Sequence, residues 1–138
     1  MKNIIVPLLL LMLSSPAMAA GSSVPYGMGG QFSRFDPVVE QYNQSGELFR
    51  IQGHCQSACT LFLAIRNVCI EPGATLLFHA GHDRQHDVNA SSTSHMLAAY
   101  NSALREYVTA NHYMDTLAFH TISGGDMISK FAYRACPK

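Results

Sequence analysis

The sequence predicts an α/β domain with a mostly parallel sheet and flanking helices. Two observations predict this class. Short apolar runs of four or five residues alternate with longer stretches in which apolar residues recur every three or four positions. Turns that contain glycine or proline separate these segments. Such alternation is typical of domains in which helices connect strands that run in the same direction.

The N-terminal stretch has the pattern of a secretory signal peptide, and we assign residues 1–19 to it. A short basic start precedes an apolar run over residues 4–13, and Ala17-Met18-Ala19 has the small-x-small form of a cleavage site. The run is shorter than the ~20 apolar residues of a membrane span. We therefore expect one mature domain, residues 20–138, that is periplasmic or secreted and has no integral membrane segment after cleavage.

Composition narrows the function classes. The 138 residues carry a formal net charge of zero, and only 13% of them are charged. Without a basic patch, or basic residues interleaved with aromatic ones, nothing favours nucleic acid as a partner.

The cysteine count is four: Cys55, Cys59, Cys69 and Cys136. An even count in an exported protein predicts disulfides, for which three pairings exist. One bridge is expected to tie the turn near residue 57 to the strand near Cys69, and the other to hold the C-terminus at Cys136.

The first half of the chain begins with a glycine-rich segment at residues 21–30, which is followed by an amphipathic helix. Phe35, Val38, Val39 and Tyr42 lie on one face of this helix, and Pro37 suits its first turn. The predicted elements in order are a helix at 32–42, a turn at 43–46, a strand at 48–51, a sharp turn at 53–60, and a helix that starts near residue 57 and contains the apolar run 61–65.

The second half alternates shorter elements with one long helix. A broad apolar face that includes Tyr100, Leu104 and Val108 predicts a single helix over 92–111. The predicted elements in order are strands at 68–70 and 74–78 with a turn at 71–73 between them, a polar loop at 82–92, the long helix, a weaker helical segment at 113–119, a turn at 122–126 and a short helix at 126–131.

Ser57 occupies the sharp turn between a predicted strand and a predicted helix. A hydroxyl there is exposed, and the first backbone N–H groups of a helix have no internal partners. This is a workable place for a nucleophile with an oxyanion hole. The structural alternative is that Ser57 caps the helix, because serine is a favoured N-cap residue.

Three chemically interesting places follow predicted strands or turns: Gly29-Gly30, Ser57 and His79. In parallel sheets, binding and catalytic sites lie at the carboxyl ends of the strands. This coincidence favours a catalytic role for Ser57.

The order of these motifs resembles the Clp-type serine peptidases of the ClpP/crotonase superfamily, and more closely a group of exported bacterial ClpP-like proteins. The resemblance covers residues 29–136. It implies that Ser57 is the nucleophile and His79 the general base. It also implies that the backbone N–H groups of Gly30 and Ala58 form the oxyanion hole. The segment 122–126 is similar to the Leu-Ser-small-x-acid element of that family.

Two departures from the family pattern limit what the resemblance implies. Members have a catalytic Asp a few positions before the Leu-Ser-like element, whereas this chain has Phe119-His120-Thr121 there. Asp126 and Asp115 are the nearby candidates for a third member, and a Ser–His dyad is the alternative. The chain also lacks the strands that precede the glycine pair in the family. Neither ring assembly nor an ATP-driven unfoldase partner is carried over, and no oligomeric state is predicted.

Three functional hypotheses follow. The first is a serine hydrolase, a peptidase or esterase that acts on a peptide or small acyl substrate without a cofactor. The second is a catalytically inactive ClpP-like binding module, in which Ser57 caps a helix. The third is a metal-binding loop, because His79, His82 and His86, with Asp83 and Asp87, offer ligands of suitable types.

Overall fold

The computed structural model describes residues 21–138, so the predicted signal peptide lies outside the described residues. Strands and helices alternate along this part of the chain, as the sequence predicts. The strands are β1 Gly21–Ser22, β2 Phe49–Ile51, β3 His54–Gln56, β4 Val68–Ile70, β5 Thr75–Phe78 and β6 His120–Ser123. The α-helices are α1 Asp36–Ser45, α2 Ala90–Ala98, α3 Ser102–Ala110 and α4 Gly124–Phe131, and the 3₁₀ helices are η1 Val24–Tyr26, η2 Phe32–Arg34 and η3 Ser57–Ala64.

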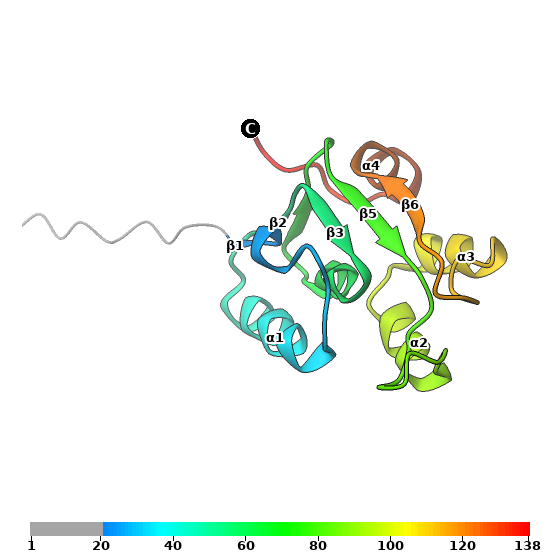
Figure 1. The fold of residues 1–138 in the computed structure, drawn as a ribbon. Helices are drawn as coiled ribbons and strands as arrows, with labels where there is room; N and C mark the ends of the chain where they lie inside the picture. The colour runs from blue at the N-terminus through cyan, green and yellow to red at the C-terminus, as the bar shows by residue number, and fades with distance from the viewer. Residues whose placement is uncertain (1–20) are drawn as a thin grey trace, which may run out of the picture.

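These strands form two small sheets, partly parallel and flanked by helices. One sheet has the order β1-β2-β4 with parallel pairs throughout. The other has the order β3-β5-β6, in which β3 is parallel to β5 and β6 is antiparallel to it. Figure 1 shows β3, β5 and β6 side by side facing the viewer, with α1 and α2 below them and α3 and α4 to the right. The α/β class is confirmed, whereas the expectation of a single sheet is wrong.

Two sheets form because the chain bends at two places, once between β2 and β3 and once between β4 and β5. Gly53, at φ +64°, separates β2 from β3, and a turn closed by the Ala74 N–H on the Glu71 carbonyl (2.9 Å) separates β4 from β5. The Thr75 N–H donates to the Gly53 carbonyl at 2.9 Å, so pairing resumes directly after the bend. The sequence run 53–60, predicted as a turn, therefore contains the strand β3.

The β3-β5-β6 sheet has one buried face and one open face. Cys55, Leu76 and Ile122 are paired across the three strands, and each is at most 5% exposed. The neighbouring set His54, Thr75 and Ser123 is paired one position along, and it is exposed or half-buried. Because side chains alternate along a strand, residues in register with the second set share the open face.

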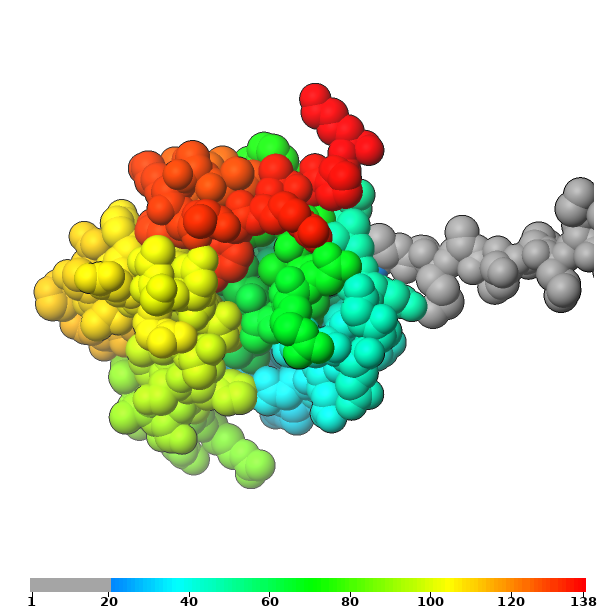
Figure 2. Space-filling view, turned by 180° about the vertical axis from the view of Figure 1, so that it is seen from behind, coloured from blue at the N-terminus to red at the C-terminus, as the bar shows by residue number. Residues whose placement is uncertain are grey.

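A cluster of phenylalanines fills the core between the sheets and the helices. The Phe62 ring of η3 lies 4.5 Å from the Phe49 ring of β2 and 5.3 Å from the Phe35 ring before α1, measured between ring centroids. All three side chains are at most 1% exposed. Seen from behind, the segments of α1, α3 and α4 surround the part of the chain that follows η3 (Figure 2). The core thus holds η3 rigidly behind the open sheet.

Three helical predictions need correction. The long helix expected over 92–111 is two helices, α2 and α3, because Asn101 caps a new helix by accepting the Leu104 N–H at 2.9 Å. The segment 113–119 forms no helix. The segment 122–126, expected to be a turn and a helix start, contains the end of β6 and then the start of α4, so only its helix start is confirmed. The 57–64 segment is a 3₁₀ helix rather than an α-helix.

The cysteines form two disulfides, Cys55–Cys59 and Cys69–Cys136. The second bridge holds the C-terminus to β4, as expected of Cys136. The expectation that the turn at residue 57 is tied to Cys69 is wrong, because Cys55 reaches the cysteine one helical turn away. Disulfides persist in oxidising compartments, so both bridges agree with a protein exported from the cytoplasm. Among residues 21–138, none of the helices has the length and apolar character needed to span a bilayer.

Candidate active site

Ser57 and His79 each follow the last residue of one of two adjacent parallel strands. β3 ends at Gln56 and β5 ends at Phe78, with Gln56 paired to Leu77. Both residues therefore leave the sheet at the same edge, the carboxyl edge at which parallel sheets place their sites.

Ser57 is the first residue of η3 and has a left-handed backbone at φ +55°. Gln56, not Ser57, is the N-cap residue of this helix, and it provides no side-chain cap. The interpretation of Ser57 as a helix cap is therefore wrong. A non-glycine residue at positive φ is uncommon and costs free energy, so the surrounding contacts must hold it there.

Two contacts on either side of Ser57 fix this bend. The Cys55–Cys59 bridge spans Ser57 symmetrically, and the Thr60 hydroxyl donates to the Ser57 carbonyl at 2.7 Å. Tyr100 lies 2.7 Å from the same Thr60 oxygen and is therefore the donor in that pair, because the single Thr60 proton is already used. Burial raises the pKa of Tyr100, which keeps its proton available.

The glycine loop at residues 27–30 is pressed against the Ser57 bend. A Cβ added at Gly29 would lie 3.0 Å from the Gln56 carbonyl oxygen, 3.1 Å from the Ser57 Cβ and 3.5 Å from the Ala58 nitrogen. Gln56 ties the loop in place, because its backbone N–H donates to the Gly27 carbonyl at 2.9 Å and its side-chain amide to the Met28 carbonyl at 3.0 Å. Only glycine allows this approach.

The predicted oxyanion donors lie on the two sides of this contact. Ala58 is buried and is the second residue of η3, where a 3₁₀ helix offers no internal acceptor for the backbone N–H. Gly30 is exposed, has φ +143° and follows Gly29, which faces Ser57 and Ala58. The glycine loop and the start of η3 thus lie next to each other.

His79 is 5% exposed and has its Nδ1 atom 2.5 Å from the Ala80 carbonyl oxygen. A carbonyl only accepts, so Nδ1 carries the proton and Nε2 of the neutral ring keeps its lone pair. Burial lowers the pKa of His79 below 6.5 and outweighs the Ala80 hydrogen bond, which raises it; nearby His82 lowers it further. The ring is therefore a neutral base at pH 7.

Each of the two predicted carboxylates binds a partner other than His79. Asp115 binds the His112 ring at 2.8 Å, and Asp126 binds Lys130 at 3.2 Å and lies in the first turn of α4. In the described part of the chain, the side-chain hydrogen bond of His79 goes to its own neighbour's carbonyl rather than to a carboxylate or to Ser57. The Ala80 carbonyl is the partner that sequence reasoning missed, and no side-chain pattern signals a backbone group.

The histidines of the loop after β5 stack rather than converge. The ring centroids of His79 and His82 lie 6.1 Å apart, and those of His82 and His86 lie 4.9 Å apart. Asp83 accepts two backbone N–H groups of its own loop. Within residues 21–138, no group of three or more His, Cys, Asp or Glu side chains has the arrangement to hold a metal ion.

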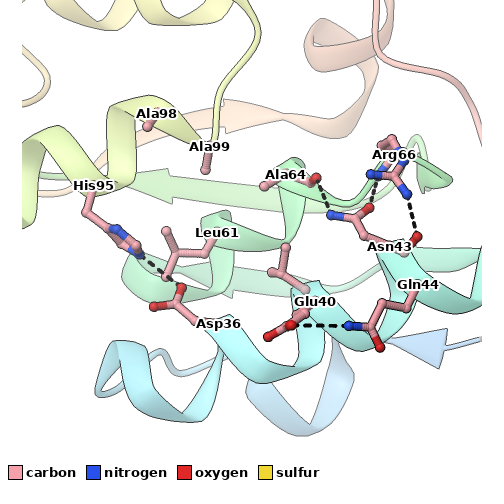
Figure 3. A pocket seen from close by; sticks show the side chains of 11 residues that line it. Asp36, Glu40, Asn43, Gln44, Leu61, Ala64, Arg66, His95, Ala98 and Ala99 are labelled. Carbon is pink, nitrogen blue, oxygen red and sulfur yellow. Dashed lines mark hydrogen bonds and ion pairs between the residues drawn. The ribbon is translucent and has the colours of Figure 1, made fainter.

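Two surface grooves lie away from this edge. One, of about 490 Å³, runs between α1 and α2, where the Asp36 carboxylate pairs with the His95 ring at 2.9 Å (Figure 3). The other, of about 540 Å³, lies between the end of η3 and the segment that follows α4. Neither groove is lined by Ser57 or His79. The candidate site thus lies apart from both grooves.

Comparisons with protein-family models, with curated proteins and with solved structures found no match to this chain. Functional conclusions for this protein therefore rest on its own residues and their geometry.

Proposed function

We propose that this protein is an exported serine hydrolase, periplasmic or secreted, with a truncated ClpP/crotonase-like fold. Its substrate would be a peptide or a small acyl ester. Ser57 is the nucleophile, His79 the general base, and the N–H groups of Gly30 and Ala58 stabilise the oxyanion. One observation carries the proposal: Ser57, at φ +55°, and His79 leave adjacent parallel strands at the same edge of the sheet.

The reaction would proceed in two acyl transfers. Ser57 Oγ attacks the acyl carbon while its proton passes to Nε2 of His79, and the carbonyl oxygen takes up negative charge beside the two N–H groups. The imidazolium returns that proton to the leaving alcohol or amine as the acyl–serine ester forms. Water then attacks the ester, gives its proton to His79, and releases the acid and free Ser57.

The Ala80 carbonyl supports His79 in place of a carboxylate. It fixes the tautomer that leaves Nε2 unprotonated, which is one of the two roles of the third member of a triad. The other role is to stabilise the imidazolium, and a neutral carbonyl does so less well than a negative charge. We therefore expect slow turnover, closer to that of a dyad than of a full triad.

Hydrolysis assays test this function directly. Release of nitrophenol from short-chain p-nitrophenyl esters, and cleavage of a fluorogenic peptide panel, would be measured for the wild type, Ser57→Ala and His79→Gln. We expect wild-type hydrolysis that both substitutions reduce to background. Hydrolysis that persists in Ser57→Ala would contradict the proposal.

The second candidate is a binding module without catalysis. It is favoured by the hydrogen bond of His79, which goes to a backbone carbonyl, and by the engagement of Asp115 and Asp126 elsewhere. A folded wild-type protein without hydrolysis on either substrate class, and without covalent reaction at Ser57, would select this function.

A further inference from the structure

Phe119 is the cross-strand neighbour of His79. The antiparallel register pairs Phe78 with His120, so the next pair beyond the end of β5 is His79 with Phe119. Their rings meet edge to face, with centroids 5.0 Å apart and planes at 79°. By the alternation of the sheet, both side chains lie on the open face.

The exposures of the two rings are opposite to what their chemistry predicts. Phe119 is 48% exposed, whereas the imidazole of His79 is 5% exposed. An apolar ring left in water gains little from its own position, but it removes water from the polar ring that it covers. Phe119 therefore contributes to the burial of His79 at the edge of the sheet.

We propose that Phe119 is a positioning residue for His79. Phe119 holds the plane of the imidazole ring and keeps water from that ring. The ring is fixed at three points. Phe119 packs against it across the strand pair, the Ala80 carbonyl binds Nδ1, and His82 stacks over it with ring planes 14° apart. Nε2 is the ring nitrogen that these contacts leave free. The role of His79 as a base rests on the proposed function, whereas the contact with Phe119 does not.

The groups that affect the titration of His79 are the Ala80 carbonyl and His82. The His86 ring lies beside His82, with centroids 4.9 Å apart and planes tilted by 37°. His82→Gln removes the neighbouring charge while Phe119 stays. Because His82 also stacks on His79, this variant tests the charge and stacking of His82 together, separately from the contact with Phe119.

Nuclear magnetic resonance of ¹⁵N-histidine-labelled protein tests the proposal without reference to activity. The full exported chain would be compared with Phe119→Ala, Phe119→Leu and the matched control Val24→Ala, which shortens an apolar side chain that is 59% exposed on η1. The His79 signals are assigned from their loss in His79→Gln. Unchanged signals of His54 and His95 show that each variant is folded.

In the wild type and Val24→Ala we expect His79 to titrate below pH 6.5 with the proton on Nδ1. In Phe119→Ala its pKa rises toward 6.5 and the Nδ1–H tautomer loses population, while Phe119→Leu retains most of the wild-type behaviour. If His79 titrates in Phe119→Ala with the wild-type pKa and tautomer, the proposal is overturned.

Kinetics separate this proposal from the proposed function. If the protein hydrolyses esters, Phe119→Ala should reduce kcat about tenfold near neutral pH with little change in KM, because a displaced base slows the chemical step. If the protein is inactive but the magnetic resonance result holds, the hydrolase function fails and the positioning by Phe119 stands. An unchanged kcat in an active Phe119→Ala enzyme would overturn the positioning.

Discussion

Gly29 faces Ser57 so closely that a methyl group on Gly29 would come within 3.1 Å of the Ser57 Cβ. The glycine loop and the serine bend are therefore one structural unit, although they are far apart in the sequence. The short distance and the left-handed φ of +74° explain why glycine suits this position.

Gly29→Ala should damage this unit specifically. The new Cβ has to displace Ser57 or the Gln56 carbonyl, and φ at Gly29 is +74°. We expect a loss of about 2–3 kcal/mol in the free energy of unfolding and a loss of reactivity at Ser57. Gly46→Ala is the matched control, because Gly46 has φ +71° but open space around its Cβ position. That control should cost about 1 kcal/mol and leave Ser57 reactive, as urea unfolding and covalent labelling would show. Equal effects of the two substitutions would show that the contact between Gly29 and Ser57 has no special importance.

The two disulfides should contribute differently to the free energy of unfolding and to the geometry at Ser57. Cys69–Cys136 closes a sequence separation of 67 residues, and Cys55–Cys59 a separation of 4. By loop entropy, replacing the first pair by alanines should cost about 4 kcal/mol and replacing the second about 2 kcal/mol. Ser57 reactivity should follow the opposite order, because only Cys55–Cys59 spans the serine. Denaturant unfolding and labelling below the melting temperature measure the two properties. A Cys55→Ala/Cys59→Ala protein with wild-type reactivity would show that the bend does not need the bridge.

Thr60 connects the bend at Ser57 to Tyr100, which follows α2. Removing the Thr60 hydroxyl should therefore destabilise the protein more than removing the Tyr100 hydroxyl. Thr60→Val leaves the buried Tyr100 hydroxyl without a partner and removes the side-chain hydrogen bond to the Ser57 carbonyl, at a cost of about 1–3 kcal/mol. Tyr100→Phe keeps the 2.7 Å bond from Thr60 to Ser57 and should cost about 1 kcal/mol. Thermal unfolding of both variants checks the order of the two costs. A more stable Thr60→Val than Tyr100→Phe would refute the proposed direction of the hydrogen bonds.

Acid should destabilise the protein through His79. Burial lowers the pKa of His79 below 6.5 in the folded state, so the unfolded chain binds this proton more tightly. The contribution of His79 to stability is therefore complete above pH 6.5 and is lost as pH falls through the folded-state pKa. His79→Gln should remove this part of the pH dependence, as urea midpoints at pH 7.5 and 5.5 would show. Parallel losses in the wild type and in the variant would count against a buried neutral His79.

Much of this site is predictable from sequence because its local signals are strong. The apolar runs before Ser57 and before His79 predict strands, and glycine marks the bends. The placement of His79 directly after a strand follows from the run before it, whereas the run before Ser57 predicts β2 and not β3, the strand that Ser57 follows. The α/β class is predictable too, because strands and helices alternate as expected even where their boundaries differ from the predicted ones.

The remaining features depend on contacts that no local pattern encodes. His54–Gln56 is too short and too polar to predict a strand, and it becomes β3 because the backbone of β5 pairs with it. Asn101 divides a continuous apolar face because its side chain finds the Leu104 N–H. The pairing of four cysteines and the carbonyl beside His79 are set by tertiary geometry. Sequence alone therefore proposes the nucleophile and the base but not what orients them.

The most direct test of the proposed catalytic pair is covalent reaction with a fluorophosphonate probe, followed by intact-mass and peptide analysis. We expect a single adduct on Ser57 of the wild type, none in Ser57→Ala, and a much slower reaction in His79→Gln. A folded wild-type protein that acquires no adduct, or one modified at another serine, would contradict the assignment of Ser57 and His79 as a catalytic pair.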